Sequence, residues 1–499
     1  MRGSGILMHI TSLPSPYGVG TMGKEAYAFV DFLANAGQTH WQILPLTPTG
    51  YGDSPYQSCS TYAGNHYLID LDLLVEEGLL ERDEIAGIDW CETNQKADFG
   101  RLYNNRLNVL RKAYERFDGS EEFDGFCSEN SMWLSDFALF MALKTRYDGK
   151  AWFQWEEDLK RRKANAIWSA RQELKNEIRF YSFVQYLFFR QWNALRSYAG
   201  EKNIRIIGDV PIYVPLDSCD VWANPELFQL DDTLTPTAVA GCPPDAFSDD
   251  GQLWGNPLYR WDVMAKDGYD WWIRRLAAAG RLYDVVRMDH FRGFEAYWAV
   301  PYGDTTAKNG KWIKGPDKDF IGTVQKKLPK LELIAEDLGF LTQEVLDLRD
   351  ESGLPGMKVL EFAFDSREPS EYLPHTYIAN TVCYTGTHDN MTMRQWFDTA
   401  APEAVEYATE YMSLRPEEGL VWGVIRTAFA SVSDLCVVQM QDYLDLGGEA
   451  RMNFPGVASG NWTWRMTPGS TTEALAKRIR SLAALYGRLQ TLSLLGVFV

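Results

Sequence analysis

The hydrophobic residues of this chain gather in eight short runs that alternate with longer polar and amphipathic stretches. In chain order the runs occupy residues 5–10, 40–46, 204–210, 284–289, 331–336, 357–364, 381–387 and 435–440. Most runs are followed by glycine, proline or polar residues and then by a helical pattern. Buried strands that alternate with helices predict a parallel sheet, and eight such units predict an α/β fold of the (β/α)8 TIM barrel type. A doubly wound open sheet is the alternative topology.

The spacing of the runs is uneven. Residues 51–203 separate the second run from the third, and this is far more chain than one βα connection requires. The part from about 73 to 186 is charged and helix-rich, which predicts a mainly helical subdomain inserted into a single barrel formed by 1–499. The region of about 211–283 contains a stretch rich in Pro, Asp and Gly at 242–255, and we expect an inserted loop region over the active site.

Three acidic residues lie at the carboxyl ends of predicted strands. Asp289, Glu336 and Asp389 each end or follow an apolar run. The carboxyl ends of parallel barrel strands meet at one face, where active sites form. Separate carboxylates that converge in this way are the groups that break a glycosidic bond. The pattern therefore predicts catalysis on a sugar.

Neighbouring residues distinguish two of these acids. Arg287 and Asp289 point to the same side of a strand, so we expect the arginine to keep the carboxylate ionised and to lower its pKa. Glu336 follows apolar residues, which would raise its pKa as a general acid requires. The adjacent Asp337 is an alternative acid, because chemistry alone does not choose between neighbours.

Further polar and aromatic residues lie near other predicted strand ends. Tyr56 could serve as a stacking platform for a sugar ring, Asp209 is near the end of the third run, and Trp254 lies in the long loop. His388 is expected to hydrogen-bond a sugar hydroxyl. We predict no metal site and no cofactor, since no H-x-H, H-E-x-x-H or C-x-x-C pattern accompanies this histidine.

Composition narrows the choice of partners. The net charge of −19 opposes binding to nucleic acid and to anionic membrane surfaces. Aromatic residues make up 14% of the chain, which suits sugar stacking but also fits a large aromatic core. No apolar run reaches the roughly 18 residues of a membrane span. The seven cysteines form no C-x-x-C pair, so we expect free thiols and a cytoplasmic location.

Ordered motifs along nearly the whole chain resemble one known family. They occupy residues 12–15, 52–57, 208–213, 243–245, 251–257, 287–293, 336–339, 386–390, 451–456 and 461–462. In these motifs the chain resembles the 4-α-glucanotransferases called amylomaltases or disproportionating enzymes, which are relatives of the α-amylases. The resemblance implies a TIM barrel with helical insertions and without a C-terminal β-sandwich domain.

The resemblance also implies roles for individual residues. Asp289 would be the nucleophile, Glu336 the general acid/base, and Asp389 the carboxylate that stabilises the distorted sugar. The implied substrate-binding residues are Ser54, Tyr56, Asp209, Asp245, Trp254, Asn256, Arg287, His388 and Asn453.

The implied reaction moves a segment of an α-1,4-glucan to the 4-hydroxyl of an acceptor glucose or maltooligosaccharide, with a covalent glucosyl-enzyme intermediate. A hydrolase that uses the same residues and a non-catalytic glucan-binding protein are the alternatives. The chain departs from the family pattern at Met391, Arg394 and Val457, and these departures bear on chain-length preference.

Overall fold

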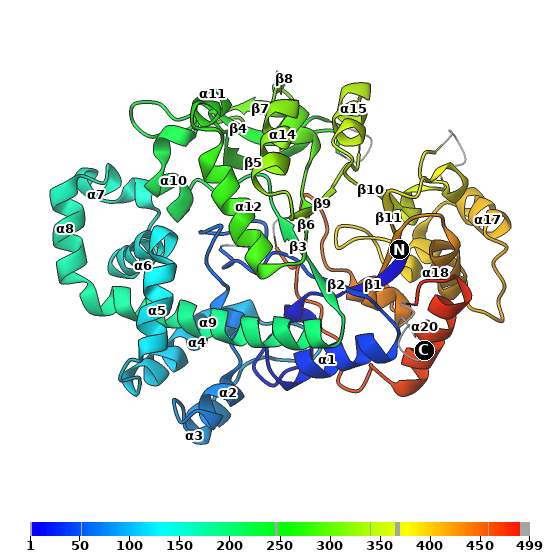
Figure 1. The fold of residues 1–499 in the computed structure, drawn as a ribbon, viewed down its shortest axis with the longest axis horizontal. Helices are drawn as coiled ribbons and strands as arrows, with labels where there is room; N and C mark the ends of the chain where they lie inside the picture. The colour runs from blue at the N-terminus through cyan, green and yellow to red at the C-terminus, as the bar shows by residue number, and fades with distance from the viewer. Residues whose placement is uncertain are drawn as a thin grey trace, which may run out of the picture.

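A computed structural model describes residues 2–50, 52–244, 248–339, 341–364, 370–457 and 459–489. Its centre is an eight-stranded parallel sheet in the order β10-β11-β12-β1-β2-β3-β6-β9 (Figure 1). The strands are β1 (Gly3–Leu7), β2 (His40–Gln42), β3 (Arg205–Val210), β6 (Val285–Met288), β9 (Glu332–Ala335), β10 (Gly356–Val359), β11 (Thr381–Tyr384) and β12 (Leu435–Gln439). Each strand overlaps one predicted run, so the parallel sheet is confirmed.

The two end strands of this sheet, β9 and β10, are joined to each other. The Ala335 N–H donates to the Pro355 carbonyl at 2.9 Å. The Asp337 carboxylate accepts from the Met357 N–H at 2.7 Å and from Arg349 Nη1 at 2.6 Å. These contacts close the sheet into a barrel, which excludes the open sheet. Asp337 is buried and binds across this junction, which favours a structural role for it over that of the alternative acid.

Helices surround the barrel. They are α1 (Lys24–Asn35), α10 (Cys219–Ala223), α11 (Trp261–Met264), α12 (Asp270–Leu282), α13 (Arg292–Glu295), α14 (Asp317–Lys327), α15 (Gln343–Glu351), α16 (Met393–Thr399), α17 (Pro402–Tyr411), α18 (Leu420–Ala430), α19 (Met440–Tyr443) and α20 (Glu473–Leu485). The last helix, α20, packs on α1 and so brings the C-terminal part of the described chain against the N-terminal part (Figure 1).

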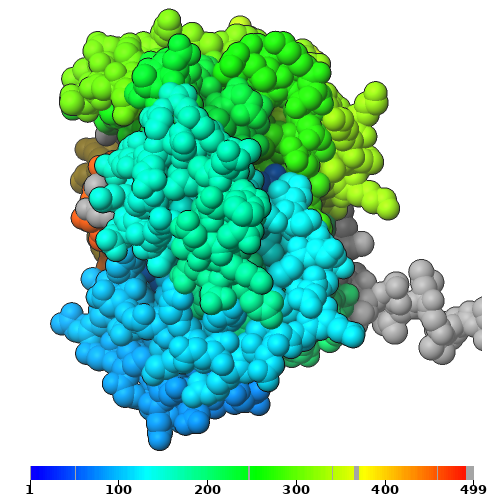
Figure 2. Space-filling view, turned by 90° about the vertical axis from the view of Figure 1, so that its left-hand side faces the viewer, coloured from blue at the N-terminus to red at the C-terminus, as the bar shows by residue number. Residues whose placement is uncertain are grey.

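Between β2 and β3 the chain forms a large helical region. Its helices are α2 (Leu71–Glu76), α3 (Arg82–Ala86), α4 (Phe99–Glu115), α5 (Glu121–Glu129), α6 (Ser131–Arg146), α7 (Glu157–Lys160), α8 (Ala164–Glu173) and α9 (Lys175–Glu201). Much of the face shown in Figure 2 consists of this region, in blue and cyan, with green residues above it. Helix α9 packs on α4 and α6 and also reaches α1 and β3 of the barrel, where Trp192 Nε1 donates to the Leu282 carbonyl at 3.2 Å.

Within the stretch 242–255, which we expected to be a loop, Cys242 and residues 252–255 belong to a second sheet. This antiparallel sheet has the order β5-β4-β7-β8, with β4 (Ala238–Cys242), β5 (Gln252–Pro257), β7 (Ala296–Pro301) and β8 (Lys311–Lys314). The loop prediction was wrong for β5 because cross-strand pairing outweighs the turn-forming residues. The alternation of a strand turns Trp254 toward Tyr213 and His290, while Leu253 on the opposite side is exposed.

The barrel junction predicts a measurable difference between two aspartates that bind the same arginine. Arg349 pairs with Asp337, whose side chain is 2% exposed, and with Asp350, whose side chain is 58% exposed. Asp337→Ala should lower the free energy of unfolding by about 3–5 kcal/mol, because it removes the buried acceptor of both Arg349 Nη1 and the Met357 N–H. Asp350→Ala should cost no more than about 1 kcal/mol.

Denaturant unfolding of the two variants checks this difference. Equal losses of stability in both variants would contradict the role of Asp337 in joining β9 to β10.

Candidate active site

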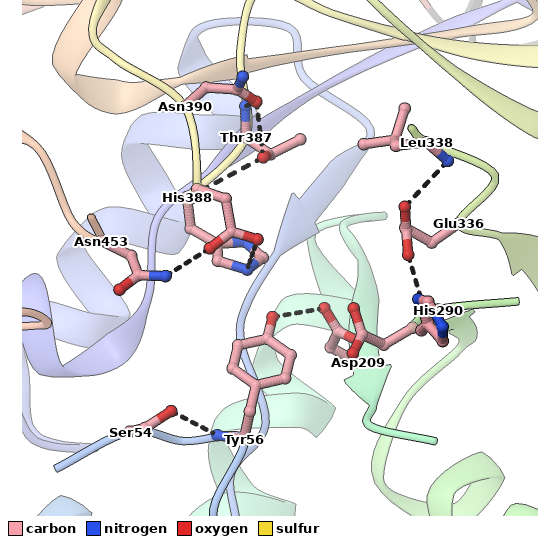
Figure 3. Close-up of polar contacts among 12 residues, drawn as sticks. Ser54, Tyr56, Asp209, His290, Glu336, Leu338, Thr387, His388, Asn390 and Asn453 are labelled. Carbon is pink, nitrogen blue, oxygen red and sulfur yellow. Dashed lines mark hydrogen bonds and ion pairs between the residues drawn. The ribbon is translucent and has the colours of Figure 1, made fainter. Parts of the chain in front are cut away.

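Acidic side chains at or just after the ends of four strands lie at the carboxyl end of the barrel, and Figure 3 labels Asp209 and Glu336 among them. Asp209 lies on β3, Asp289 directly follows β6, Glu336 directly follows β9, and Asp389 lies in the loop after β11. Strands β3, β6 and β9 are neighbours in the sheet, and β11 is separated from β9 by β10 where the barrel closes. The structure therefore brings the three predicted catalytic acids to the same end of the fold.

Arg287 joins two of these acids. Its Nη1 lies 2.7 Å from Asp209 Oδ2 and 2.9 Å from Asp289 Oδ1. The Arg287 and Asp209 side chains are almost completely buried, while 25% of the Asp289 side chain is exposed. Burial lowers the pKa of Arg287, but the charges of Asp209 and Asp289 outweigh it and leave that pKa well above its usual value. The guanidinium therefore stays charged.

Asp289 differs from our expectation. We expected Arg287 to lower its pKa, but the pKa of Asp289 is raised to about 6, chiefly by burial. Arg287 opposes this rise, but its charge is shared with Asp209, and the charges of Asp209 and Asp389 add to the effect of burial. The expected direction was wrong because the sequence shows neither how deeply this carboxyl is buried nor how many acids one arginine binds. At pH 7 the carboxyl is still mostly ionised.

Glu336 accepts two backbone hydrogen bonds. The His290 N–H donates to Oε2 at 2.7 Å and the Leu338 N–H donates to Oε1 at 3.0 Å (Figure 3). His290 adopts the left-handed conformation, with φ of 50°, which is uncommon for a residue other than glycine and marks local backbone strain. Burial raises the pKa of Glu336 to about 7, with Arg287 opposing and Asp289 adding to the rise.

Burial raises the pKa of both carboxyls, so one proton is readily held between them near neutral pH. The direct contact of Arg287 with Asp289 favours the ionised form of Asp289. Because the two groups interact, the charge on Asp289 itself helps Glu336 keep its proton. A carboxylate nucleophile beside a protonated carboxylic acid is the pair that glycosidic bond cleavage needs.

Asp389 is bound from two sides. Its Oδ2 lies 3.3 Å from His388 Nε2, and its Oδ1 accepts from Asn453 Nδ2 at 2.6 Å (Figure 3). Arg451 Nη2 donates to the Asp389 backbone carbonyl at 2.9 Å. Burial raises the pKa of Asp389, but His388 and Asn453 outweigh it and leave that pKa well below its usual range. Burial lowers the pKa of His388, and the neighbouring Asp389 reverses this into a net rise.

Tyr56 connects the β2 loop to this cluster. Its hydroxyl donates to Asp209 Oδ2 at 2.9 Å, and its ring stacks on His388 with centroids 5.1 Å apart. Trp462 lies against both rings, at 5.8 and 5.9 Å. Ser54 Oγ accepts from the Tyr56 N–H at 3.2 Å and so shapes the turn that presents the tyrosine. Within this structure Ser54 therefore acts on the backbone of Tyr56.

The antiparallel sheet closes one side of the cluster. The Trp254 ring meets His290 edge to face at 4.8 Å, next to the backbone that binds Glu336. Asn256 Oδ1 accepts from Gln57 Nε2 at 3.2 Å, which ties strand β5 to the Tyr56 loop. Asp245, the remaining predicted substrate-binding residue, lies outside the described residues.

Several contributors to the site were not singled out by sequence reasoning. The backbone N–H groups of His290 and Leu338, the guanidinium of Arg451 and the ring of Trp462 all act here. These residues lie within the family motifs, but the sequence does not show which backbone N–H groups will act as donors. Gln57, which binds Asn256, has a similarly indirect role.

The three departures from the family pattern lie around the Asp389 loop and the loop that bears Asn453. Met391 donates its N–H to Glu361 Oε1 at 3.4 Å, and Arg394 Nε pairs with Asp445 Oδ1 at 2.9 Å. Val457 is more than half exposed. The two hydrogen bonds of Met391 and Arg394 do not involve the Asp389 carboxylate.

Within the described ranges, no group of three or more His, Cys, Asp or Glu side chains is arranged to bind a metal ion. In the same part of the chain, no helix has both the length and the hydrophobicity needed to cross a bilayer. Cys59, Cys91, Cys127, Cys219, Cys383 and Cys436 are free thiols.

Known proteins similar to this chain over nearly its whole length are 4-alpha-glucanotransferases. A family sequence profile described as 4-alpha-glucanotransferase matches residues 8–472. The 4-alpha-glucanotransferase of Clostridium butyricum is 49% identical over 96% of this chain and 100% of its own length. That of Thermus thermophilus is 47% identical over 98% of this chain and 99% of its own.

A solved structure agrees with these relatives. The amylomaltase from Streptococcus agalactiae, in complex with acarbose, has a TM-score of 0.95 and 44% identity over 98% of this chain and 100% of its own. These matches, together with the barrel and its convergent acids, show that the chain belongs to the 4-α-glucanotransferase family.

Proposed function

We propose that the site described above catalyses glucan transfer by a retaining double displacement. The enzyme moves a segment of an α-1,4-glucan or maltooligosaccharide to the 4-hydroxyl of an acceptor glucose or glucan. One observation supports the residue roles most strongly. Among the described residues Asp289 is bound to a buried arginine, which favours its ionised form, whereas Glu336 is bound to backbone N–H groups and burial raises its pKa, as a proton donor requires.

In the first step Glu336 donates its proton to the glycosidic oxygen while an Asp289 oxygen attacks the anomeric carbon. The bond to the leaving glucan breaks, and a covalent glucosyl-Asp289 ester remains. In the second step Glu336, now ionised, takes the proton of the acceptor 4-hydroxyl. That oxygen attacks the anomeric carbon, the ester bond breaks, and Asp289 leaves as a carboxylate with the original configuration restored.

The residues around these two acids would bind and distort the sugar. Asp389, kept ionised by His388 and Asn453, can accept from sugar hydroxyls and stabilise positive charge on the ring. Two buried atoms, Asp209 Oδ1 and His388 Nδ1, have no hydrogen-bond partner among the described residues, which suits them to sugar hydroxyls. The Tyr56 ring offers an apolar face for stacking.

Hydrolysis by the same residues is the alternative outcome, because water can replace the acceptor sugar. Trp254 and its sheet lie beside the Glu336 backbone contact and can limit the entry of water. The named relatives at 47–49% identity are transferases, which favours transfer.

Incubation with maltotriose separates the possibilities. Transfer yields glucose together with longer oligosaccharides and little gain in reducing ends. A steady rise in reducing ends would show a hydrolase, and no change in the sugars would show a binding protein, so either result would overturn the proposed function.

Asp289→Asn should abolish transfer while leaving the fold intact. The amide cannot form the ester, so the rate of maltotriose disproportionation should fall at least about 1,000-fold, equivalent to about 4 kcal/mol. The matched control is Asp284→Asn, at the opposite end of the same apolar run, where the acid pairs with Arg196 and accepts from the Ile206 N–H. The control should keep its rate within a few-fold; equal losses in both variants would contradict the role of Asp289.

The rate should depend on pH through both carboxyls. It should fall below about pH 6 as Asp289 gains a proton, and above about pH 7 as Glu336 loses the proton that it must donate. Glycosyl transfer from an α-maltosyl fluoride needs little protonation of its leaving group. With this donor and a saturating acceptor, the alkaline fall should shift or weaken while the acidic fall remains. An identical alkaline fall with both donors would argue against Glu336 as the acid.

Trp254→Ala should raise the share of hydrolysis. Removing the ring beside His290 opens the acid side of the site to water, so the ratio of reducing ends released to transfer products should increase several-fold. Trp168→Ala, a change at an exposed tryptophan of α8, is the control and should leave that ratio unchanged. Simultaneous assay of glucose, reducing ends and maltotetraose gives the ratio, and an unchanged ratio in Trp254→Ala would disprove the shielding role.

A further inference from the structure

One buried carboxylate binds both ends of the loop that bears Asp389. This loop, residues 385–393, connects β11 to α16. Asp442 on α19 is fully buried, and its Oδ2 accepts from Thr385 Oγ1 at 2.6 Å. Its Oδ1 accepts from the Met393 N–H at 2.8 Å. Asp442 thus fixes the first and the last residue of the loop to the chain that follows β12.

The interior of the loop is bound mostly from the same neighbouring segment. Gln439 Nε2 donates to the Met391 carbonyl at 3.2 Å, and Arg451 Nη2 donates to the Asp389 carbonyl at 2.9 Å. Inside the loop, the Thr387 N–H donates to Asn390 Oδ1 at 2.9 Å. The position of Asp389 relative to Asn453 therefore depends on how the loop is seated against this segment.

Burial of the Asp442 carboxylate is unfavourable for folding. Among the described residues no Arg, Lys or His forms an ion pair with it, and burial raises its pKa to about 6 against hydrogen bonds from Thr385, Met393 and Gln439. A buried carboxylate without a cation opposes folding unless its hydrogen bonds compensate. Two of these three partners, Thr385 and Met393, belong to the Asp389 loop, and the third, Gln439, also binds that loop at the Met391 carbonyl.

We propose that Asp442 is a positioning residue for the transfer reaction, acting through the 385–393 loop on His388 and Asp389. It does not touch the sugar. By fixing both ends of the loop it sets the place at which the Asp389 carboxylate meets the distorted glucose ring. This inference rests on the proposed function, because it concerns the step that Asp389 assists.

The test compares Asp442→Asn with a matched aspartate elsewhere. Asp70 is also buried and also accepts from a threonine hydroxyl and a backbone N–H, those of Thr21 at 2.6 Å and Leu73 at 3.1 Å. It lies at the start of α2 and binds nothing in the 385–393 loop. Both Asn variants should lower the thermal midpoint. Only Asp442→Asn should lower kcat for maltotriose, by about 10–100-fold as expected for a small displacement of a reacting group, with KM changed less than about threefold.

A second pair of variants keeps the test valid if Asp442→Asn does not fold. Thr385→Val removes the hydroxyl that binds Asp442 and should lower kcat in the same way, whereas Thr385→Ser keeps the hydroxyl and should restore it. In the double variant with Asp442→Asn, the loss from Thr385→Val should be much smaller than in the wild-type background, because both changes break one contact.

The possible results distinguish failure of the proposed function from failure of the positioning role of Asp442. A wild-type chain that does not disproportionate maltotriose contradicts the proposed function. An active wild type in which Asp442→Asn keeps its kcat, or in which Thr385→Val and Thr385→Ser lose kcat equally, contradicts only the positioning role. An equal loss of kcat in Asp70→Asn and Asp442→Asn would reduce the effect to general destabilisation and would also overturn it.

Discussion

The catalytic end of this barrel depends on the buried guanidinium of Arg287. The parallel register places Arg287 of β6 directly opposite Asp209 of β3, and the two-residue period of the strand places Asp289 on the same side. One nitrogen therefore donates to both carboxylates. Tyr56 binds the same oxygen of Asp209, so the position of the stacking ring also follows from this charge.

The crowding of acids around one arginine explains how similar groups acquire different properties. Burial and the surrounding negative charges raise the pKa of Asp289 to about 6 and that of Glu336 to about 7. Asp389 moves in the opposite direction because His388 and Asn453 bind its carboxylate directly. The three acids thus differ by what each one contacts, and the fold supplies those contacts from separate strands.

The sequence predicted the barrel and its acids well, for a physical reason. Strands buried on both faces are short apolar runs, and polar residues at their carboxyl ends stand out, which is why Asp289, Glu336 and Asp389 could be found. It did not predict strand β5, because cross-strand pairing there outweighs the turn residues. It also gave the wrong direction for the pKa of Asp289, since that pKa is raised chiefly by burial in the folded barrel and further by Asp209, 80 positions earlier in the chain. The sequence also did not predict the two hydrogen bonds of Asp442 to the Asp389 loop, because they join residues far apart in the chain.

The covalent intermediate on Asp289 is the central claim, and trapping it is the most direct measurement. In a Glu336→Gln variant an α-maltotriosyl fluoride can still form the ester without acid assistance, while the loss of the base slows its transfer to an acceptor. Rapid acid quenching, proteolysis and mass spectrometry should then find one maltotriosyl group on the peptide that contains Asp289, and none after a further Asp289→Asn change. Label on another residue, or fluoride release in a burst with no labelled peptide, would contradict the account.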